Sequence, residues 1–535
     1  MGQTADWFLT ADERGNPATR IDRRRGADGQ AWTDGNLARP LVHGRTYLAR
    51  LAGLLRELGK DDQIHFTDWR GDPDQHLDDD GTELGPLLAE LARRGVQVRG
   101  LLWRSHPSHE YSEQEALQLG RLVNDAGCEV FLDERVRATG CHHQKLVVIR
   151  HADDADRDVA FVGGIDLCHG RRDDERHQGD PQPVEMSTRY GPRPPWHDVQ
   201  LELHGPAVGD VAWTFRERWE DPTPLDHRNP VRARITRKAD QPRRPSPLPP
   251  ARQDPAPVGT CAVQVLRTYP NKHPKLPFAP AGERSIARAY IKAFGRARHL
   301  IYVEDQYLWS KEVAKELAAA LRRQRDLHLV AALPCYPETD GIFAEQPAKV
   351  GREAAVDMLK EAGGDRVAVY DLENEAGVPI YVHAKVCIVD DVWATVGSDN
   401  LNRRSWTHDS ELTCAVLDEA RDGREPTDPG GLGDGARAFA RDLRLRLWRE
   451  HLGRADGDDA DLVDPVTGFA AWRETAGRLA AWDAGGRSGE RPPGRVTPHT
   501  PDPVPRWASW WARPAYRLVV DPDGRPLRLR LARRF

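Results

Sequence analysis

Two short segments, far apart in the chain, each carry a histidine and a lysine separated by one residue. The later one is His383-Ala-Lys385 and the earlier one is His143-Gln-Lys145. A neutral imidazole can attack phosphorus, and a protonated one can donate to a leaving oxygen. Lysine ammonium groups can hold anionic phosphoryl oxygens. Two such pairs facing each other would supply the groups for phosphodiester exchange through a covalent enzyme intermediate.

The residues around both motifs predict β-strands. After Lys385 the chain alternates between apolar and other residues, with Asp390-Asp391 at a predicted turn and Gly397 closing a second strand. Side chains on a strand alternate between faces, so His383 and Lys385 share one face. The earlier motif runs into the apolar segment 146–149 and then into VAFVGG, which ends at Gly164.

Elements upstream of the two motifs also correspond. An apolar strand followed by a helical pattern precedes each motif, at 64–66 and 84–93 in the first case and at 300–303 and 311–322 in the second. A further apolar strand follows each helix. We therefore predict two copies of one α/β unit, each ending in H-x-K.

The complete pattern, HxK(x4)D followed by GSxN, resembles that of the phospholipase D superfamily in its longer, two-motif form. The segments FVGGIDLCHGR, PWHDVQLELHGPAV, IYVEDQYL and RLWREHLG are similar to segments of the same family, and the resemblance covers about residues 41–453. It implies an α/β fold of two pseudo-symmetric phospholipase D-type α/β/α halves with mixed sheets. The active site is expected at their interface.

The resemblance also implies roles for individual residues. His143 is expected to be the nucleophile and His383 the acid, although the residues alone leave this order open. Orienting carboxylates are expected at Asp198 in the first half and Glu411 in the second, with Asp409 as the weaker candidate. The expected phosphate-binding residues are Lys145, Lys385, Ser398 and Asn400, whereas Asp166 stands in the first half where Asn400 stands in the second.

The first motif departs from the family pattern because it lacks the aspartate that Asp390 supplies in the second. Arg150 stands at that position, and the segment between Lys145 and Gly163 is six residues longer than its counterpart. Counting back from the glycine places Asp156 where Asp390 falls. We therefore predict that Asp156 replaces the missing structural acid.

Composition suggests five regions along the chain. We predict a partly irregular N-terminal cap (1–40), a first half (41–220), a Pro/Arg-rich linker (221–259), a second half (260–453) and a C-terminal extension (454–535). The extension ends in YRLVVDPDGRPLRLRL, which predicts a hairpin with Asp-Gly at its turn. The nearby Trp507, Trp510 and Trp511 either pack on the main body or contact a membrane interface.

Charge and cysteine content limit the classes of function. A net charge of −6 gives no overall attraction to nucleic acid, so stable nucleic-acid binding is not expected. The seven cysteines are scattered without metal-ligand spacing, so no metal and no cofactor are predicted. No apolar run approaches the roughly 20 residues of a membrane span, and no signal-peptide pattern is visible. We expect a cytoplasmic or peripheral membrane protein that acts as a monomer.

The expected function is phospholipase D-type hydrolysis, or transphosphatidylation, of glycerophospholipid headgroups through phosphohistidine at a membrane surface. The alternatives are a cardiolipin synthase-like phosphatidyltransferase, a nuclease-type phosphodiesterase, a phospholipase toxin delivered to other cells, and a catalytically silent lipid- or nucleic-acid-binding homologue. The missing acid after Lys145 favours the silent homologue. Retention of both H-x-K pairs favours an enzyme.

Overall fold

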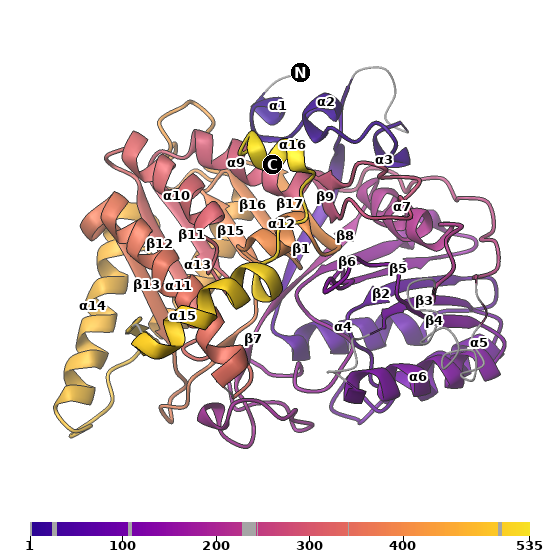
Figure 1. The fold of residues 1–535 in the computed structure, drawn as a ribbon, viewed down its shortest axis with the longest axis horizontal. Helices are drawn as coiled ribbons and strands as arrows, with labels where there is room; N and C mark the ends of the chain where they lie inside the picture. Colours follow the sequence, from indigo (N-terminus) through magenta and orange to yellow (C-terminus); the bar gives the residue numbers. More distant parts are fainter. Residues whose placement is uncertain are drawn as a thin grey trace.

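A single mixed β-sheet runs through the whole molecule and carries helices on both faces (Figure 1). The computed structural model describes residues 3–23, 29–104, 110–226, 242, 244–340, 342–500 and 505–535. Within these residues the sheet has sixteen strands, and a separate two-stranded ladder pairs β7 (Trp196–His197) with β14 (Tyr381–Val382).

The two halves of this sheet have the same topology. The first half has the strand order β1 (Thr33–Val42), β8 (Val199–His204), β6 (Val159–Gly163), β5 (Leu146–Arg150), β2 (Gln63–Asp68), β3 (Gln97–Trp103) and β4 (Glu129–Asp133). The second half has the order β9 (Cys261–Tyr269), β17 (Glu411–Asp418), β16 (Trp393–Gly397), β15 (Val386–Val389), β11 (Leu300–Glu304), β12 (His328–Leu333) and β13 (Val367–Leu372).

Strand directions repeat as well. In each half the first four pairings are antiparallel and the last two are parallel. The antiparallel pair of β1 and β9 joins the halves into one sheet. The predicted α/β fold of two pseudo-equivalent halves is therefore confirmed, and both H-x-K motifs lie immediately before corresponding strands, β5 and β15.

Helices cover both faces because their apolar residues fall on one side at helical spacing. In α5 (Leu84–Arg93), for example, Leu84, Leu87, Leu88 and Leu91 are buried. The other long helices are α4 (Gly44–Arg56), α6 (Glu110–Asp125), α7 (Ala207–Trp219), α9 (Ser285–Arg296), α10 (Lys311–Arg323), α11 (Ile342–Gly363), α13 (Ala438–Leu452) and α14 (Pro465–Ala484). None of the described helices is long and apolar enough to cross a membrane.

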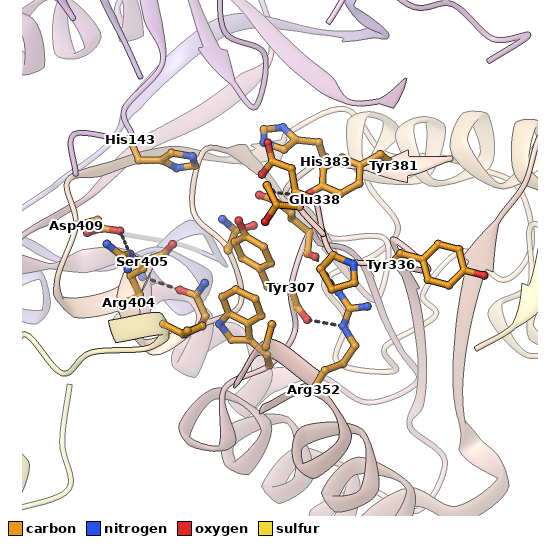
Figure 2. Close-up of a pocket in the computed structure, with 18 of the residues that line it drawn as sticks. His143, Tyr307, Tyr336, Glu338, Arg352, Tyr381, His383, Arg404, Ser405 and Asp409 are labelled. Carbon is orange, nitrogen blue, oxygen red and sulfur yellow. Dashed lines mark hydrogen bonds and ion pairs between the residues drawn. The ribbon is translucent and has the colours of Figure 1, made fainter. Parts of the chain in front are cut away.

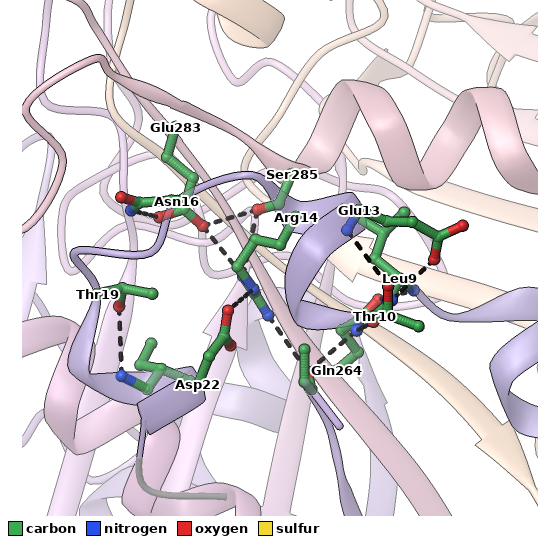
Figure 3. A network of polar contacts seen from close by, with 12 residues as sticks. Leu9, Thr10, Glu13, Arg14, Asn16, Thr19, Asp22, Gln264, Glu283 and Ser285 are labelled. Atoms are coloured by element: carbon green, nitrogen blue, oxygen red, sulfur yellow. Dashed lines mark hydrogen bonds and ion pairs between the residues drawn. The ribbon is translucent and has the colours of Figure 1, made fainter. Parts of the chain in front are cut away.

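The N-terminal region is more ordered than the predicted cap. It forms α1 (Gln3–Trp7), α2 (Ala11–Arg14), α3 (Arg20–Arg23) and the beginning of β1, so the predicted boundary at residue 40 cuts a strand of the first half. Figure 3 shows how a buried polar network fixes this region: the Arg14 guanidinium lies 3.0 Å from both Glu283 and Asp22, and the Asn16 amide donates to Glu283. Glu283 belongs to β10 (Glu283–Arg284), which pairs with β9.

The predicted linker is only partly visible. Residues 227–241 and 243 lie outside the described residues. The described part from 244 onwards contacts the first half, since the Trp219 indole donates to the Ser246 carbonyl at 2.8 Å.

The predicted C-terminal hairpin is wrong. Helix α15 (Arg506–Ala515) continues as a π-helical turn η5 (Tyr516–Val520), and after Asp521 a short helix α16 (Leu527–Leu531) follows. Backbone carbonyl groups that a hairpin would pair between its strands are instead hydrogen-bonded to arginines of the main body. Arg404 donates to the Val519 carbonyl at 2.9 Å, and Arg403 donates to the Asp521 carbonyl at 3.0 Å. The Asp521 carboxylate in turn accepts the Arg404 backbone N–H.

The structural aspartate is present in one half and replaced in the other. Asp390 accepts the backbone N–H groups of residues 298–300 and so ties its turn to the start of β11. Asp156 does not take this role, because its side chain is exposed. Instead Asp158 is fully buried and binds the Arg150 guanidinium at 2.5 Å, and Asp62, just before β2, accepts the Ala152 N–H at 2.7 Å. In the first half, carboxylates at other positions therefore hold the corresponding turn in place.

This difference gives a stability prediction. Asp158→Ala should lower the free energy of unfolding by about 3–5 kcal/mol, because it leaves the Arg150 charge buried and unpaired. Asp156→Ala is the matched control and should change it by less than about 0.5 kcal/mol. Denaturant unfolding measures both values. Equal losses in the two variants would contradict the assignment of the turn.

Candidate active site

A cavity of about 840 Å³ opens between the two halves, and both motif histidines line it. Figure 2 shows His143 and His383 on the same side of this cavity, entering from different halves of the sheet. The structure therefore brings the two predicted imidazoles to one space.

His143 is held by residues of the second half. Its backbone N–H donates to the Ser410 carbonyl at 2.8 Å, and its Nδ1 lies 2.9 Å from Oε2 of Glu411. A carboxylate at Nδ1 fixes the ring orientation and leaves Nε2 free. The Nε2 atom of His143 is thus the nitrogen available for chemistry.

His383 is held by residues of the first half in the same way. Its backbone N–H donates to the His197 carbonyl at 2.8 Å, and its Nδ1 lies 2.7 Å from Oδ2 of Asp198. The ring of Trp196 packs beside it with ring centroids 4.9 Å apart. Each histidine therefore takes its carboxylate from the opposite half, whereas the sequence suggested one carboxylate for each half separately.

Ser398 does not line the cavity, and its predicted phosphate contact stays a prediction. It is fully buried, donates to Oε2 of Glu411 at 2.6 Å and accepts the Leu412 N–H. Its hydroxyl therefore positions the carboxylate that orients His143. Asn400, by contrast, lines the cavity, and its Oδ1 has no hydrogen-bond partner among the described residues.

Both lysines lie behind the histidines. The Lys145 ammonium is 3.3 Å from Asp166 and 3.3 Å from the His143 carbonyl. The Lys385 ammonium contacts Oε1 of Gln306 at 3.3 Å and also the His383 carbonyl. Asp166, whose position was in question, faces the cavity and pairs with Lys145, and this charge together with Arg171 lowers its pKa although burial would raise it.

Burial and the lysines set the protonation of the site. Burial, reinforced by the Lys145 charge for His143 and by the Lys385 charge for His383, holds both imidazole pKa values well below their usual range. Both rings are therefore neutral at pH 7 before substrate binds. Burial and the nearby Asp409 raise the pKa of Glu411 to about 8. A positive charge on His143 lowers this pKa again, because an adjacent imidazolium favours the carboxylate form.

Three polar residues of the cavity were not predicted. Arg171 stacks on Trp196 at 4.1 Å, Arg404 binds Asp409 at 2.6 Å, and Gln306 contacts Lys385. Arg171 lies in the long loop after Asp166, and Gln306 directly follows the acids at the end of β11. Loops that follow strands often carry functional residues, because the sheet positions them rigidly. Asp409 faces the cavity but contacts Arg404 rather than an imidazole.

Aromatic residues form the remaining walls. Trp69 stacks on Trp103 at 5.6 Å and Tyr307 on Trp309 at 3.9 Å, and all four line the cavity. Trp406 does not, because it is buried against Tyr290. A polar floor with aromatic walls suits a ligand with an anionic centre and an apolar body.

A second cluster of titratable groups lies behind His383. We call it the histidine–glutamate cluster, and its members are His43, His177, His197, His451, Glu304 and Glu450. Among the described residues, two overlapping sets within it could hold a metal ion, with ligand atoms within 4.8 Å of one another. Nε2 atoms of His43 and His177 contact different oxygens of Glu450, at 2.9 and 3.0 Å, which are hydrogen-bond separations.

The histidine–glutamate cluster connects the halves next to the catalytic pair. His197 binds Glu304 at 2.8 Å through its ring, while its carbonyl accepts the N–H groups of His383 and Ala384. Because residue 197 is followed directly by Asp198, this cluster fixes the backbone that carries the partner of His383.

Buried neutral histidines predict acid lability. Burial, together with Arg216 for His65 and Arg218 for His142, lowers both pKa values to about 3. The unfolded chain binds these protons below about 6.5 and the folded chain does not, so stability is complete above pH 6.5 and falls as the pH drops towards 3. The expected slope is about 1.4 kcal/mol per pH unit for each histidine. Urea unfolding between pH 7 and 4.5 measures it, and His65→Phe should reduce it; a slope unchanged in that variant would contradict the assignment.

Family models and curated relatives match both halves of the chain. A family model described as Phospholipase D matches residues 74–331, and one described as Cardiolipin synthase, PLD-like domain, matches residues 290–422. Curated relatives include phospholipase D alpha 1 of Cynara cardunculus (26% identical, 72% of this chain and 60% of that protein), phospholipase D A of Dictyostelium discoideum (29%, 73% and 34%) and phospholipase D2 of Bos taurus (26%, 83% and 56%).

Among solved structures, phosphatidylserine synthase of Haemophilus influenzae superposes with a TM-score of 0.49 and 14% identity, over 71% of this chain and 82% of that one. The chain spans between a third and three-fifths of the length of the three curated relatives. The two family models and these relatives cover both motifs, so the chain is similar to members of the phospholipase D superfamily in both halves.

Proposed function

We propose that this protein is a phospholipase D-type phosphodiesterase that releases the headgroup alcohol of a glycerophospholipid through a phosphohistidine intermediate. The observation that carries the proposal is the crossed arrangement of the site. Two neutral imidazoles from different halves line one cavity, and each is oriented by a carboxylate of the opposite half. The names of the curated relatives, all phospholipases D, support the same class of activity.

In the first step Nε2 of His143 attacks the phosphorus, and the bond from phosphorus to the headgroup oxygen breaks. His383, protonated once the substrate's negative charge has raised its pKa, donates its proton to that oxygen. Glu411 stabilises the positive charge that His143 acquires. In the second step His383 removes a proton from water, the water oxygen attacks phosphorus, and His143 leaves. An alcohol in place of water would give a new phosphatidyl ester.

The lysines and Asn400 are proposed to hold the phosphoryl oxygens. Lys145 and Lys385 would turn from their present partners, Asp166 and Gln306, towards the substrate's negative charge. No metal or other cofactor has a part in these steps, so chelator treatment is expected to leave headgroup release unchanged. Since one chain supplies both halves of the site, we propose that a monomer is active.

The Lys385 charge predicts how activity depends on pH. Burial, reinforced by repulsion from Lys145 and opposed by Asp198, lowers the pKa of Lys385 to about 8. Binding of the phosphate needs the charged form, which is present below that pKa and lost as the pH rises through it. We expect kcat/KM to fall about tenfold per pH unit above roughly pH 8. In Lys385→Arg this fall should disappear; a profile flat to pH 10 in the wild type would contradict the role.

Headgroup release from mixed phospholipid vesicles tests the proposed function itself. Wild type should release choline or another headgroup, and His143→Ala and His383→Ala should not. Equal release by all three proteins would contradict the proposal. Plasmid cleavage by the wild type, with no release from lipid, would instead favour the nuclease alternative.

A further inference from the structure

The C-terminal segment carries an unusual share of exposed apolar side chains. Half of the ten large hydrophobic residues that are exposed in the described chain lie between residues 510 and 531. They are Trp510 (84% exposed), Leu518 (71%), Val519 (55%), Leu527 (70%) and Leu531 (77%). Scattered exposed leucines are ordinary, but this many within 22 residues indicate an interaction site.

This segment borders the mouth of the active-site cavity. Val519 and Val520 belong to the cavity wall. The turn that carries them is fixed to the body, because the Tyr516 hydroxyl donates to the Trp309 carbonyl at 2.7 Å and Arg404 binds the Val519 carbonyl. Figure 1 shows the yellow C-terminal segment crossing the near face of the molecule, with α15 beside α11. The exposed Leu518 and Val519 therefore adjoin the entrance to the site, and Trp510 lies on the helix that precedes them.

The same segment is strongly basic in an otherwise acidic chain. Residues 506–535 contain eight arginines and two aspartates, a net charge of +6, whereas the whole chain has −6. Six of these arginines are exposed: Arg513, Arg517, Arg528, Arg530, Arg533 and Arg534. Exposed arginines interspersed with tryptophan and leucine fit an anionic bilayer, in which apolar tips enter the headgroup region and the guanidinium groups meet lipid phosphates.

We propose that the C-terminal surface, formed by residues 510–534 around the exposed apolar and arginine side chains named above, docks the enzyme on a bilayer that contains anionic phospholipid. Docking there presents the cavity mouth to the lipid, so a substrate molecule enters along Val519 and Val520 without crossing water. The proposal rests on the proposed function for its substrate, but binding to vesicles is a separate property that needs no turnover.

The test uses full-length protein in which Trp510→Ser and Leu518→Asp are combined; neither residue lines the cavity. Leu122→Asp combined with Leu432→Asp is the matched control, since both leucines are exposed on other elements, at 39% each. Sedimentation with vesicles of phosphatidylcholine and phosphatidylglycerol measures binding, in a His143→Ala background that prevents turnover. We expect binding to fall at least about tenfold in the Trp510/Leu518 variant and to remain in the control. Salt, or vesicles of phosphatidylcholine alone, should weaken wild-type binding.

Activity on two forms of substrate separates this proposal from the proposed function. The Trp510/Leu518 variant should lose headgroup release from vesicles in proportion to its binding, yet retain turnover of a short-chain phospholipid below its critical micelle concentration. Unchanged vesicle binding in this variant would overturn the docking proposal even if the enzyme is active. A wild type that binds vesicles through this surface but cleaves neither substrate would overturn the proposed function alone. Wild-type dimers in gel filtration that the variant abolishes, or tighter binding to DNA than to vesicles, would show that the surface has another occupant and would also overturn docking.

Discussion

His143→Ala is expected to lower kcat for headgroup release by about 10⁴-fold or more, on any phosphodiester substrate, because it removes the atom that attacks phosphorus. His383→Ala should cause a similar loss with choline as the leaving alcohol, but for another reason. There the missing group is the proton donor, which an alkoxide leaving group needs and a nitrophenolate does not. Release of p-nitrophenol from a phosphatidyl-p-nitrophenyl ester should therefore survive in His383→Ala far better than in His143→Ala.

Rates measured with the two leaving groups check this assignment. His143→Gln and His383→Gln, which retain a side chain of similar size, control for collapse of the cavity. If p-nitrophenol release survives in the His143 variant and not in the His383 variant, the two histidines have the opposite roles. If the leaving group makes no difference in either variant, the division into nucleophile and acid is wrong.

The crossed carboxylates predict the second large effect. Asp198→Asn should lower kcat by about 10²–10⁴-fold, since an amide no longer stabilises the imidazolium of His383. With the p-nitrophenyl leaving group the loss of kcat in Asp198→Asn should be much smaller, as in the His383 variants. This is expected although Asp198 belongs to the half that carries His143. Glu411→Gln should behave like the His143 variants and gain no relief, because Glu411 binds Nδ1 of His143 at 2.9 Å.

A double-mutant cycle makes this prediction specific. Asp198→Asn should add little to the loss in His383→Ala, and Glu411→Gln little to the loss in His143→Ala, because each pair acts as a unit. Asp409→Asn is the matched control, since Asp409 faces the cavity but contacts Arg404 and no imidazole. Strong coupling of Asp198 with His143 instead would contradict the arrangement across the halves.

The two halves and the histidine–lysine pairs were predictable because they depend on local order along the chain. Apolar strands, helical spacing and the repeated H-x-K place His143 and His383 at corresponding strands, β5 and β15, and the order of the strands then brings them together. The repeated sequence pattern does not show how the two halves pack against each other. The partnership of Asp198 with His383 depends on that packing, so each carboxylate was attributed to the half in which it lies.

The remaining errors also arise from contacts between distant segments. Asp156 stands at the same distance from its glycine as Asp390 does from Gly397. Burial rather than spacing decides which carboxylate holds a turn, and Asp158 is the buried one. The alternating apolar and arginine residues near the C-terminus suit a hairpin locally, yet Arg403 and Arg404 bind the backbone at 519 and 521.

The covalent adduct is the most direct test of a reaction in which one imidazole attacks and the opposite one donates the proton. His383→Ala is mixed with the p-nitrophenyl ester, quenched in alkali, digested and mapped by mass spectrometry, with His143→Ala treated identically. A phosphatidyl group on the peptide that contains residue 143, present in the first protein and missing in the second, is the predicted result. A modified residue 383 in the His143 variant, or p-nitrophenol release in a burst with no adduct on either histidine, would contradict it.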